Sequence, residues 1–210
     1  MIRVLIADDH AVVRQGLIQI LGDTPEMVVA GVATTGQEVL DQVRAATWDV
    51  VVLDISLPDR SGLDVLKELR AERPALPILV LSMYSEDQYA RRVLKAGAAG
   101  YVTKDTAADE LVRAIRKVVS GGRYVSPSLA EKLALEIGTD ASRLPHETLS
   151  DREFQVLKLL AAGKSVKEIA AELSLSVKTI STYRVRMLEK MHLRTTAELM
   201  HYALQNHLID

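Results

Sequence analysis

The sequence predicts an α/β domain with a parallel sheet, followed by a smaller all-α domain. In the first half of the chain, five short runs of β-branched and aliphatic residues alternate with amphipathic stretches of helical length. The last third carries helical patterns only. A length of 210 residues fits one large domain or two small ones, and the change of pattern midway favours two.

The composition is that of an ordinary soluble globular protein, with 48% hydrophobic and 26% charged residues. Cysteine is absent, which excludes disulfides, thiolate metal sites and cysteine nucleophiles and is compatible with a reducing compartment. The longest apolar runs are far shorter than the roughly 20 residues that span a bilayer, and the N-terminus lacks a signal-peptide pattern. We therefore expect a cytoplasmic protein with no membrane partner.

The predicted strands are residues 2–7, 27–32, 50–53, 78–81 and 99–103. Each is a short apolar run, as expected of a strand that is buried on both faces. Thr35 and Glu38 have the spacing of a capping box at the start of the second helix, and Gly22 and Gly97 stand where helix C-caps are expected. Alternating βα units imply a doubly wound, flavodoxin-like sheet, for which we expect the strand order 2-1-3-4-5.

Reactive side chains follow four of these strands. Asp8 and Asp9 end the first strand, Asp54 the third, Ser82 the fourth and Lys104 the fifth. These four strands are neighbours in the order 2-1-3-4-5, so the side chains are expected to converge on one pocket. A single Asp after a strand is commonly a turn residue or a helix cap, but four strand ends with complementary chemistry favour a site.

The chemistry of this predicted pocket is that of phosphoryl transfer to a carboxylate. Three carboxylates that lie close together repel one another and call for a cation, and oxygen ligands suit Mg²⁺. The ammonium of Lys104 and the hydroxyl of Ser82 are suited to phosphoryl oxygens.

Residues 119–147 are predicted to be a linker. The pattern loosens after Val119, and Ser126 with Pro127 is typical of a helix start, so a short helix to about residue 137 is expected. Residues 138–142 and 144–147 are typical of loops. His146 precedes a Glu, but no second His follows at helical spacing, so we expect no metal site there.

Residues 148–210 are predicted to form four helices. Ser150 and Glu153 form a capping box before the first helix, at 154–162, and Gly163 would close it. Helices are also expected at 166–173, from 177 to about 191, and at 195–206. The second and third are joined by a tight turn and have a helix-turn-helix layout.

The third of these helices has two distinct faces when residues are placed about 100° apart. Ile180, Met187 and Met191 share the apolar face. The opposite face consists of Lys178, Ser181, Thr182 and Val185, with Arg186 on its flank.

The basic excess of the chain also lies in this domain. Residues 148–210 carry nine Lys and Arg against seven Asp and Glu, whereas residues 1–118 carry 14 against 17. The outer helix face can lie in a DNA major groove, with its cations near phosphates and Ser181 and Thr182 within reach of base edges. On charge alone, a solvated helix face is the alternative explanation.

Residues 1 to about 118 resemble the receiver domain of bacterial two-component response regulators. The resemblance lies in Ala-Asp-Asp-His at 7–10, Leu-Asp-Ile-Ser-Leu-Pro at 53–58, Leu-Ser at 81–82 and Gly-Tyr-Val-Thr-Lys-Asp at 100–105. It implies that Asp54 is a phosphoacceptor that takes its phosphoryl group from a phosphohistidine on a sensor histidine kinase.

The same resemblance implies roles for the other residues of the pocket. Mg²⁺ would be held by Asp8, Asp9, Asp54 and the backbone carbonyl of Ser56. Lys104 would pair with the attached phosphoryl group, and Ser82 and Tyr101 would form a switch pair in which Tyr101 turns inward once Ser82 moves toward the phosphoryl oxygens.

Residues 148–210 resemble the LuxR-type DNA-binding domain of the NarL/FixJ response regulators. The matching segments are 149–153, 160–163, 167–170 and 176–184. Together, the two resemblances imply a transcription regulator rather than an enzyme, which binds double-stranded DNA. In it, Lys167 would touch the DNA backbone, and the third helix, which includes Thr179, would read the sequence.

The family binds DNA as homodimers, so we expect a homodimer at least in the phosphorylated or DNA-bound state, with RNA polymerase as a further candidate partner. Some relatives carry Lys at the positions held here by Ser181 and Val185. This difference implies a different operator sequence.

Two other functions are consistent with parts of the pattern. One is an Mg²⁺-dependent phosphatase with an Asp nucleophile, but such enzymes usually place the nucleophile after the first strand with a second Asp two residues on, and here Asp8 and Asp9 are adjacent. The other is a DNA-binding regulator that works without phosphorylation. The complete set of Asp8, Asp9, Asp54, Ser82 and Lys104 argues against it.

Overall fold

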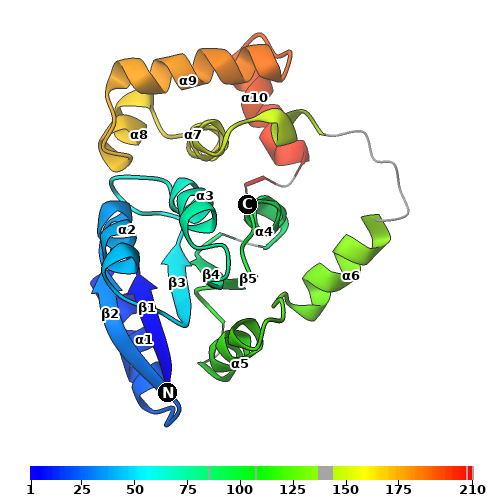
Figure 1. Cartoon of the computed structure of the whole chain (residues 1–210). Helices are drawn as coiled ribbons and strands as arrows, with labels where there is room; N and C mark the ends of the chain where they lie inside the picture. Colours follow the sequence, from blue (N-terminus) through cyan, green and yellow to red (C-terminus); the bar gives the residue numbers. More distant parts are fainter. Residues whose placement is uncertain (85, 107, 137–143, 207, 210) are drawn as a thin grey trace. The chain divides into compact units, whose positions relative to one another are not determined.

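The computed structural model consists of two compact units, residues 1–138 and 139–210. It describes the chain except for residues 85, 107, 137–143, 207 and 210 (Figure 1). Side chains are described for the same residues, except those of 86–88, 132–136, 147 and 151.

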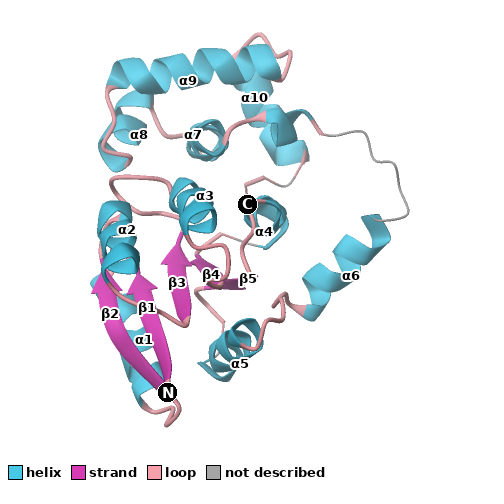
Figure 2. Ribbon diagram, in the orientation of Figure 1, coloured by secondary structure: helices cyan, strands magenta, loops and turns pink. Residues whose placement is uncertain are grey.

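The first unit is built on a parallel sheet with the strand order β2-β1-β3-β4-β5, which confirms the predicted order (Figure 2). The strands are β1 (Ile2–Ala7), β2 (Met27–Ala33), β3 (Val50–Asp54), β4 (Ile78–Ser82) and β5 (Gly100–Thr103). In the register, Ala7 pairs with Leu53, and Ser82 pairs with Thr103. The carboxyl ends of β1, β3, β4 and β5 therefore lie along one edge of the sheet.

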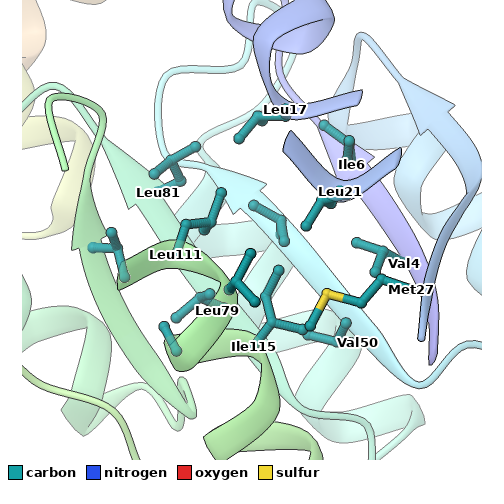
Figure 3. Packing of buried hydrophobic residues seen from close by; sticks show 14 of the residues in the cluster. Val4, Ile6, Leu17, Leu21, Met27, Val50, Leu79, Leu81, Leu111 and Ile115 are labelled. Atoms are coloured by element: carbon teal, nitrogen blue, oxygen red, sulfur yellow. The ribbon is translucent and has the colours of Figure 1, made fainter. Parts of the chain in front are cut away.

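Five helices cover the two faces of this sheet (Figure 1). They are α1 (Ala11–Gly22), α2 (Gly36–Ala45), α3 (Gly62–Glu72), α4 (Glu86–Lys95) and α5 (Ala108–Val119). Figure 3 shows Leu17 and Leu21 of α1 and Leu111 and Ile115 of α5 packed on strand residues such as Val50. The helices α1 and α5 therefore share one hydrophobic core on the same face of the sheet.

The predicted helix caps are confirmed in part. The Thr35 hydroxyl accepts a hydrogen bond from the Glu38 N–H (3.1 Å), but the Glu38 carboxylate accepts from the N–H of Thr34 instead of completing the box. Gly97 has the predicted left-handed conformation, with φ of +99°. The expectation for Gly22 is wrong, because this residue is the last of α1 and the cap is Asp23 in a right-handed conformation.

The segment after α5 is tied to the edge of the sheet. The N–H of Tyr124 donates to the carbonyl of Ala99 (2.9 Å), and the Tyr124 carbonyl accepts from the N–H of Tyr101 (3.2 Å). A Cβ atom at Gly100 would lie 2.7 Å from the Tyr124 carbonyl oxygen, so a glycine is needed for this close approach. Tyr124, within the segment expected to be a linker, thus pairs with β5.

The helix predicted in this segment is α6 (Pro127–Glu136), and the Ser126 hydroxyl accepts from the N–H of Leu129 at its start (3.2 Å). The loop predicted at 138–142 lies outside the described residues. Residues 144–147 were also expected to be a loop, but Pro145–Thr148 forms a 3-10 turn.

The second unit contains the four predicted helices. They are α7 (Asp151–Ala161), α8 (Val166–Glu172), α9 (Val177–Lys190) and α10 (Thr196–Gln205). The capping box of Ser150 and Glu153 is complete, and Gly163 ends α7 with φ of +84°. In the described part of the chain, no helix is both long and apolar enough to cross a membrane.

Candidate functional site

The predicted pocket forms at the carboxyl edge of the sheet, where Asp54 ends β3, Asp8 follows β1 and Lys104 follows β5. The Lys104 Nζ lies 2.8 Å from Asp54 Oδ2 and 2.7 Å from Asp8 Oδ2. All three side chains are nearly excluded from solvent, at 3% exposure or less. The fold therefore buries two carboxylates around a single ammonium.

Asp9 and His10 extend this cluster toward solvent. Ligand atoms of Asp8, Asp9, His10 and Asp54 all lie within 4.8 Å of one another. The His10 Nδ1 is 2.6 Å from Asp9 Oδ1, and the His10 N–H donates to Asp8 Oδ1 (2.8 Å). Sequence reasoning did not assign His10 to the site, although it directly follows the two acidic residues. We call Asp8, Asp9, Asp54 and Lys104 the acidic pocket. Its three carboxylates outnumber its one ammonium, and carboxylate oxygens are suited to a hard divalent cation.

Burial and neighbouring charges have opposite effects on the pKa values of Asp54 and Lys104. Burial raises the pKa of the Asp54 carboxyl above its ordinary value, and the Lys104 ammonium and the Ser56 N–H offset only part of this rise. For Lys104, burial lowers the pKa, but Asp54 and Asp8 outweigh it and hold the pKa above its ordinary value. Lys104 thus stays charged beside the two buried carboxylates.

The turn after β3 holds Asp54 in place. The Ser56 N–H donates to Asp54 Oδ1 (3.1 Å), and the Gly62 N–H donates to the carbonyl of Ile55 (2.9 Å). A Cβ atom at Gly62 would lie 2.2 Å from the Asp54 carbonyl oxygen and 2.7 Å from the Ile55 Cα. Sequence reasoning missed Gly62, because a glycine at a helix start gives no sign that another backbone segment packs against it.

Ser82 and Tyr101 are linked through the backbone of Tyr84. The Ser82 hydroxyl oxygen accepts a hydrogen bond from the Tyr84 N–H (3.2 Å), and the Tyr101 hydroxyl donates to the Tyr84 carbonyl (2.6 Å). Both Ser82 and Tyr101 are fully buried. Tyr101 is therefore turned inward in this structure, and a movement of Ser82 would reach it through a single residue.

The faces of α9 agree with the predicted phase. Ile180, Met187 and Met191 are buried. The outer face of α9, as we use the term below, consists of Val177, Lys178, Ser181, Thr182, Val185 and Arg186. All of these are exposed except Ser181, which is half-buried. Lys167, on α8, is also exposed.

Hydrogen bonds within α9 engage three of the predicted DNA-contacting hydroxyls. Thr179 belongs to the helix cap, because its hydroxyl lies 2.7 Å from the Ser176 hydroxyl and its N–H donates to the same oxygen. The Ser181 hydroxyl donates to the carbonyl of Val177 (2.9 Å), and the Thr182 hydroxyl donates to the carbonyl of Lys178 (3.0 Å). One cation of α9 is engaged too, since the Lys190 Nζ lies 2.6 Å from the buried Glu153 carboxylate of α7.

His146 packs against two aromatic side chains of the second unit. Its Nδ1 lies 2.8 Å from the Tyr202 hydroxyl, and its ring lies against those of Phe154 and Tyr202. Within the described side chains, the candidate metal-binding group that we find is the one around Asp54, and it does not include His146.

Two known families match this chain. The response regulator receiver domain matches residues 4–116, and the bacterial regulatory proteins of the luxR family match residues 147–203. Among curated proteins, the chain is 37% identical to the response regulator GacA of Pseudomonas aeruginosa, over 100% of this chain and 99% of that protein. It is likewise 37% identical to the response regulator UvrY of Escherichia coli strain K12, over 100% of this chain and 97% of that protein.

Solved structures give the same result. The response regulator ChrA of a heme-sensing two-component system is 31% identical, with a TM-score of 0.54 over 99% of this chain and 98% of that one. The Salmonella response regulator RcsB, bound to the rprA promoter in the presence of the phosphomimetic BeF3⁻, is 27% identical, with a TM-score of 0.67 over 96% of this chain and 97% of that one.

Proposed function

Since the chain belongs to the response regulators that join a receiver domain to a LuxR-family DNA-binding domain, we propose that Asp54 accepts a phosphoryl group from a sensor histidine kinase and thereby controls DNA binding. The observation that carries this proposal is the buried contact of the Lys104 ammonium with Asp54 and Asp8 at the carboxyl edge of the sheet. The protein is a transcription regulator, and the only chemistry proposed for it is the gain and loss of its own phosphoryl group.

In the proposed transfer, a carboxylate oxygen of Asp54 attacks the phosphorus of a phosphohistidine. The new O–P bond forms as the P–N bond breaks, and the imidazole leaves with the electron pair. Lys104 pairs with a phosphoryl oxygen, and its two present contacts already hold it beside the attacking carboxylate (2.8 Å). The Ser82 hydroxyl, at the end of the neighbouring strand, can donate to a second phosphoryl oxygen.

The acidic pocket fits the divalent cation that receiver domains are expected to use. Asp8, Asp9, Asp54 and the backbone carbonyl of Ser56 would hold Mg²⁺, and the clustering of the carboxylate oxygens within 4.8 Å supports this assignment. When bound, the ion would offset negative charge on the transferring group.

The signal is proposed to leave the pocket through Tyr84. When Ser82 turns toward the phosphoryl group, its oxygen no longer accepts from the Tyr84 N–H, and Tyr84, whose carbonyl accepts from the Tyr101 hydroxyl, is released to shift. Such a change biases a two-state element through new charge-assisted hydrogen bonds. Tyr101 is inward already, so the proposed change is a shift of Tyr84 rather than an inward turn of Tyr101.

The DNA-binding output is assigned to residues 148–210, with 1–118 as the phosphoacceptor domain and 119–147 as the linker. In this proposal α9 lies in the major groove. The contacting residues are then Lys167, Lys178, Thr179, Ser181, Thr182, Val185 and Arg186. A related structure is described as two RcsB dimers bound to two parallel DNAs, which supports a homodimer here. We also propose that the protein acts in the cytoplasm and that RNA polymerase is a further partner.

The test is a binding titration with Asp54→Asn, after an operator has been selected from random duplexes. A small phosphodonor with Mg²⁺ should raise the operator affinity of the wild type but not that of Asp54→Asn. Asp64→Asn, a change at an exposed carboxylate of α3, is the matched control and should respond like the wild type. Equal stimulation of Asp54→Asn would contradict the proposal and favour a regulator that works without phosphorylation.

A further inference from the structure

The outer face of α9 carries two exposed aliphatic side chains. Val177 is 47% exposed and Val185 is 49% exposed. They are eight residues apart, so Ser181 lies midway between them on one i, i+4, i+8 row. From this row, and on the basis of the proposed DNA binding, we infer that Val177 and Val185 recognise thymine methyl groups in the major groove.

The hydroxyls of this face are compatible with the same readout. The protons of the Ser181 and Thr182 hydroxyls are used in hydrogen bonds to the carbonyls of Val177 and Lys178. Toward DNA these side chains therefore offer acceptor lone pairs. An acceptor pairs with an amino group such as adenine N6, whereas the O6 and N7 atoms of guanine need donors. Cytosine N4 is an amino group as well, so these acceptors suit either adenine or cytosine, and it is the thymine methyl groups beside the valines that would select A·T pairs.

The spacing sets where the methyl groups should lie. Eight residues of α-helix rise about 12 Å, which is about three to four base-pair steps of 3.4 Å. Each valine can cover only the base beneath it, so two separate thymines should be read in each half-site. Lys178 and Arg186 are exposed on the same outer face, where their charges can meet the phosphates on either side.

The test removes single methyl groups from the DNA. An operator is selected from random duplexes with the full chain in the presence of Mg²⁺ and a small phosphodonor. Each thymine in it is then replaced in turn by uracil, which keeps every hydrogen-bonding group and lacks only the methyl. We expect two positions per half-site where uracil lowers wild-type affinity about three- to fivefold, the value of one buried methyl group.

Valine variants assign each position. At one of the two sensitive positions, Val185→Ala should bind the thymine operator and the uracil operator with equal affinity. Val177→Ala should show the same loss of sensitivity at the other position. Leu204→Ala is the matched control, because Leu204 is an aliphatic side chain of α10 with a similar exposure of 55%, and it should keep both sensitivities.

The outcomes separate this inference from the proposed function. Tight operator binding without any loss on uracil replacement overturns the inference and leaves DNA binding intact. Losses that persist in both valine variants also overturn it, because the methyl groups would then act through DNA shape. If the selection enriches no sequence, the proposed function fails and the inference with it.

Discussion

The packing of Gly62 against the phosphoacceptor turn gives a prediction whose size follows from the structure. In Gly62→Ala, the new Cβ would lie 2.2 Å from the Asp54 carbonyl oxygen and 2.7 Å from the Ile55 Cα. A normal carbon–oxygen contact is about 3.3 Å, so the chain must shift by about 1 Å. Both neighbours are backbone atoms, so no side-chain rotation can relieve the contact.

We expect two consequences of this shift. Overpacking of this kind costs about 1–3 kcal/mol of stability. A displacement of about 1 Å at a reacting group can slow a reaction by about 100-fold, so phosphorylation of Asp54 should slow by about 10- to 100-fold. Urea unfolding followed by Trp48 fluorescence measures the first effect in the receiver unit alone, because this is the one Trp of the chain. The mass gain per unit time with a small phosphodonor measures the second.

Gly16→Ala provides the control. A Cβ there meets no heavy atom within 4 Å, and the residue lies inside α1. This change should stabilise the receiver unit by about 0.5–1 kcal/mol through helix propensity and leave phosphorylation unchanged. If Gly62→Ala is as stable as the wild type and is phosphorylated as fast, the proposed role of the glycine is wrong.

Three further predictions concern the other parts of the molecule. Although burial raises the pKa of Glu153, hydrogen bonds from Lys190 and the helix start lower it overall. Its carboxylate therefore stabilises the fold above about pH 4.3, and this contribution is lost as pH falls through the lowered pKa. Glu153→Gln should cost about 1–3 kcal/mol at pH 7. Urea unfolding followed by far-UV circular dichroism measures the free energy of unfolding. The difference between the wild type and Glu153→Gln should shrink toward pH 3, and a difference independent of pH would contradict the reasoning. Tyr101→Phe should still gain a phosphoryl group but lose part of the stimulated operator affinity, because the hydroxyl that holds the β4–α4 segment is gone; full stimulation would exclude this link. Lys178→Ala should weaken operator binding and reduce by about 1 the slope of the logarithm of the binding constant against the logarithm of the salt concentration. Arg73→Ala of the receiver is the control. An unchanged slope in Lys178→Ala would remove Lys178 from the DNA contacts.

The parts of the fold that follow local rules could be predicted from the sequence. The alternation of short apolar runs with amphipathic helices indicated the parallel sheet, and its order β2-β1-β3-β4-β5 brings Asp8, Asp54 and Lys104 together as expected. The capping box of Ser150 and the buried face of α9 were also predicted, since both depend on spacing within one helix.

The features that were missed depend on main-chain hydrogen bonds between segments that are not adjacent in the sequence. Such bonds leave no pattern of residue types. Tyr124 pairs with the edge of β5 through main-chain groups, which any residue carries, so this pairing has no side-chain signal beyond the neighbouring Gly100. The link from Ser82 to Tyr101 likewise runs through the N–H and carbonyl of Tyr84. The hydroxyl of Thr179 lies beside the Ser176 cap, and its assignment as a DNA contact stays a prediction.

The measurement that tests the central claim most directly is the intact mass of the protein after incubation with Mg²⁺ and a small phosphodonor, quenched in acid at times from seconds to minutes. The wild type and Asp54→Asn are compared side by side, with and without the metal. We expect the wild type to gain the mass of one phosphoryl group only when Mg²⁺ is present, and Asp54→Asn to gain none. A wild type that gains no mass at any time, or an Asp54→Asn variant that gains as much as the wild type, would contradict the assignment of Asp54 as the phosphoacceptor.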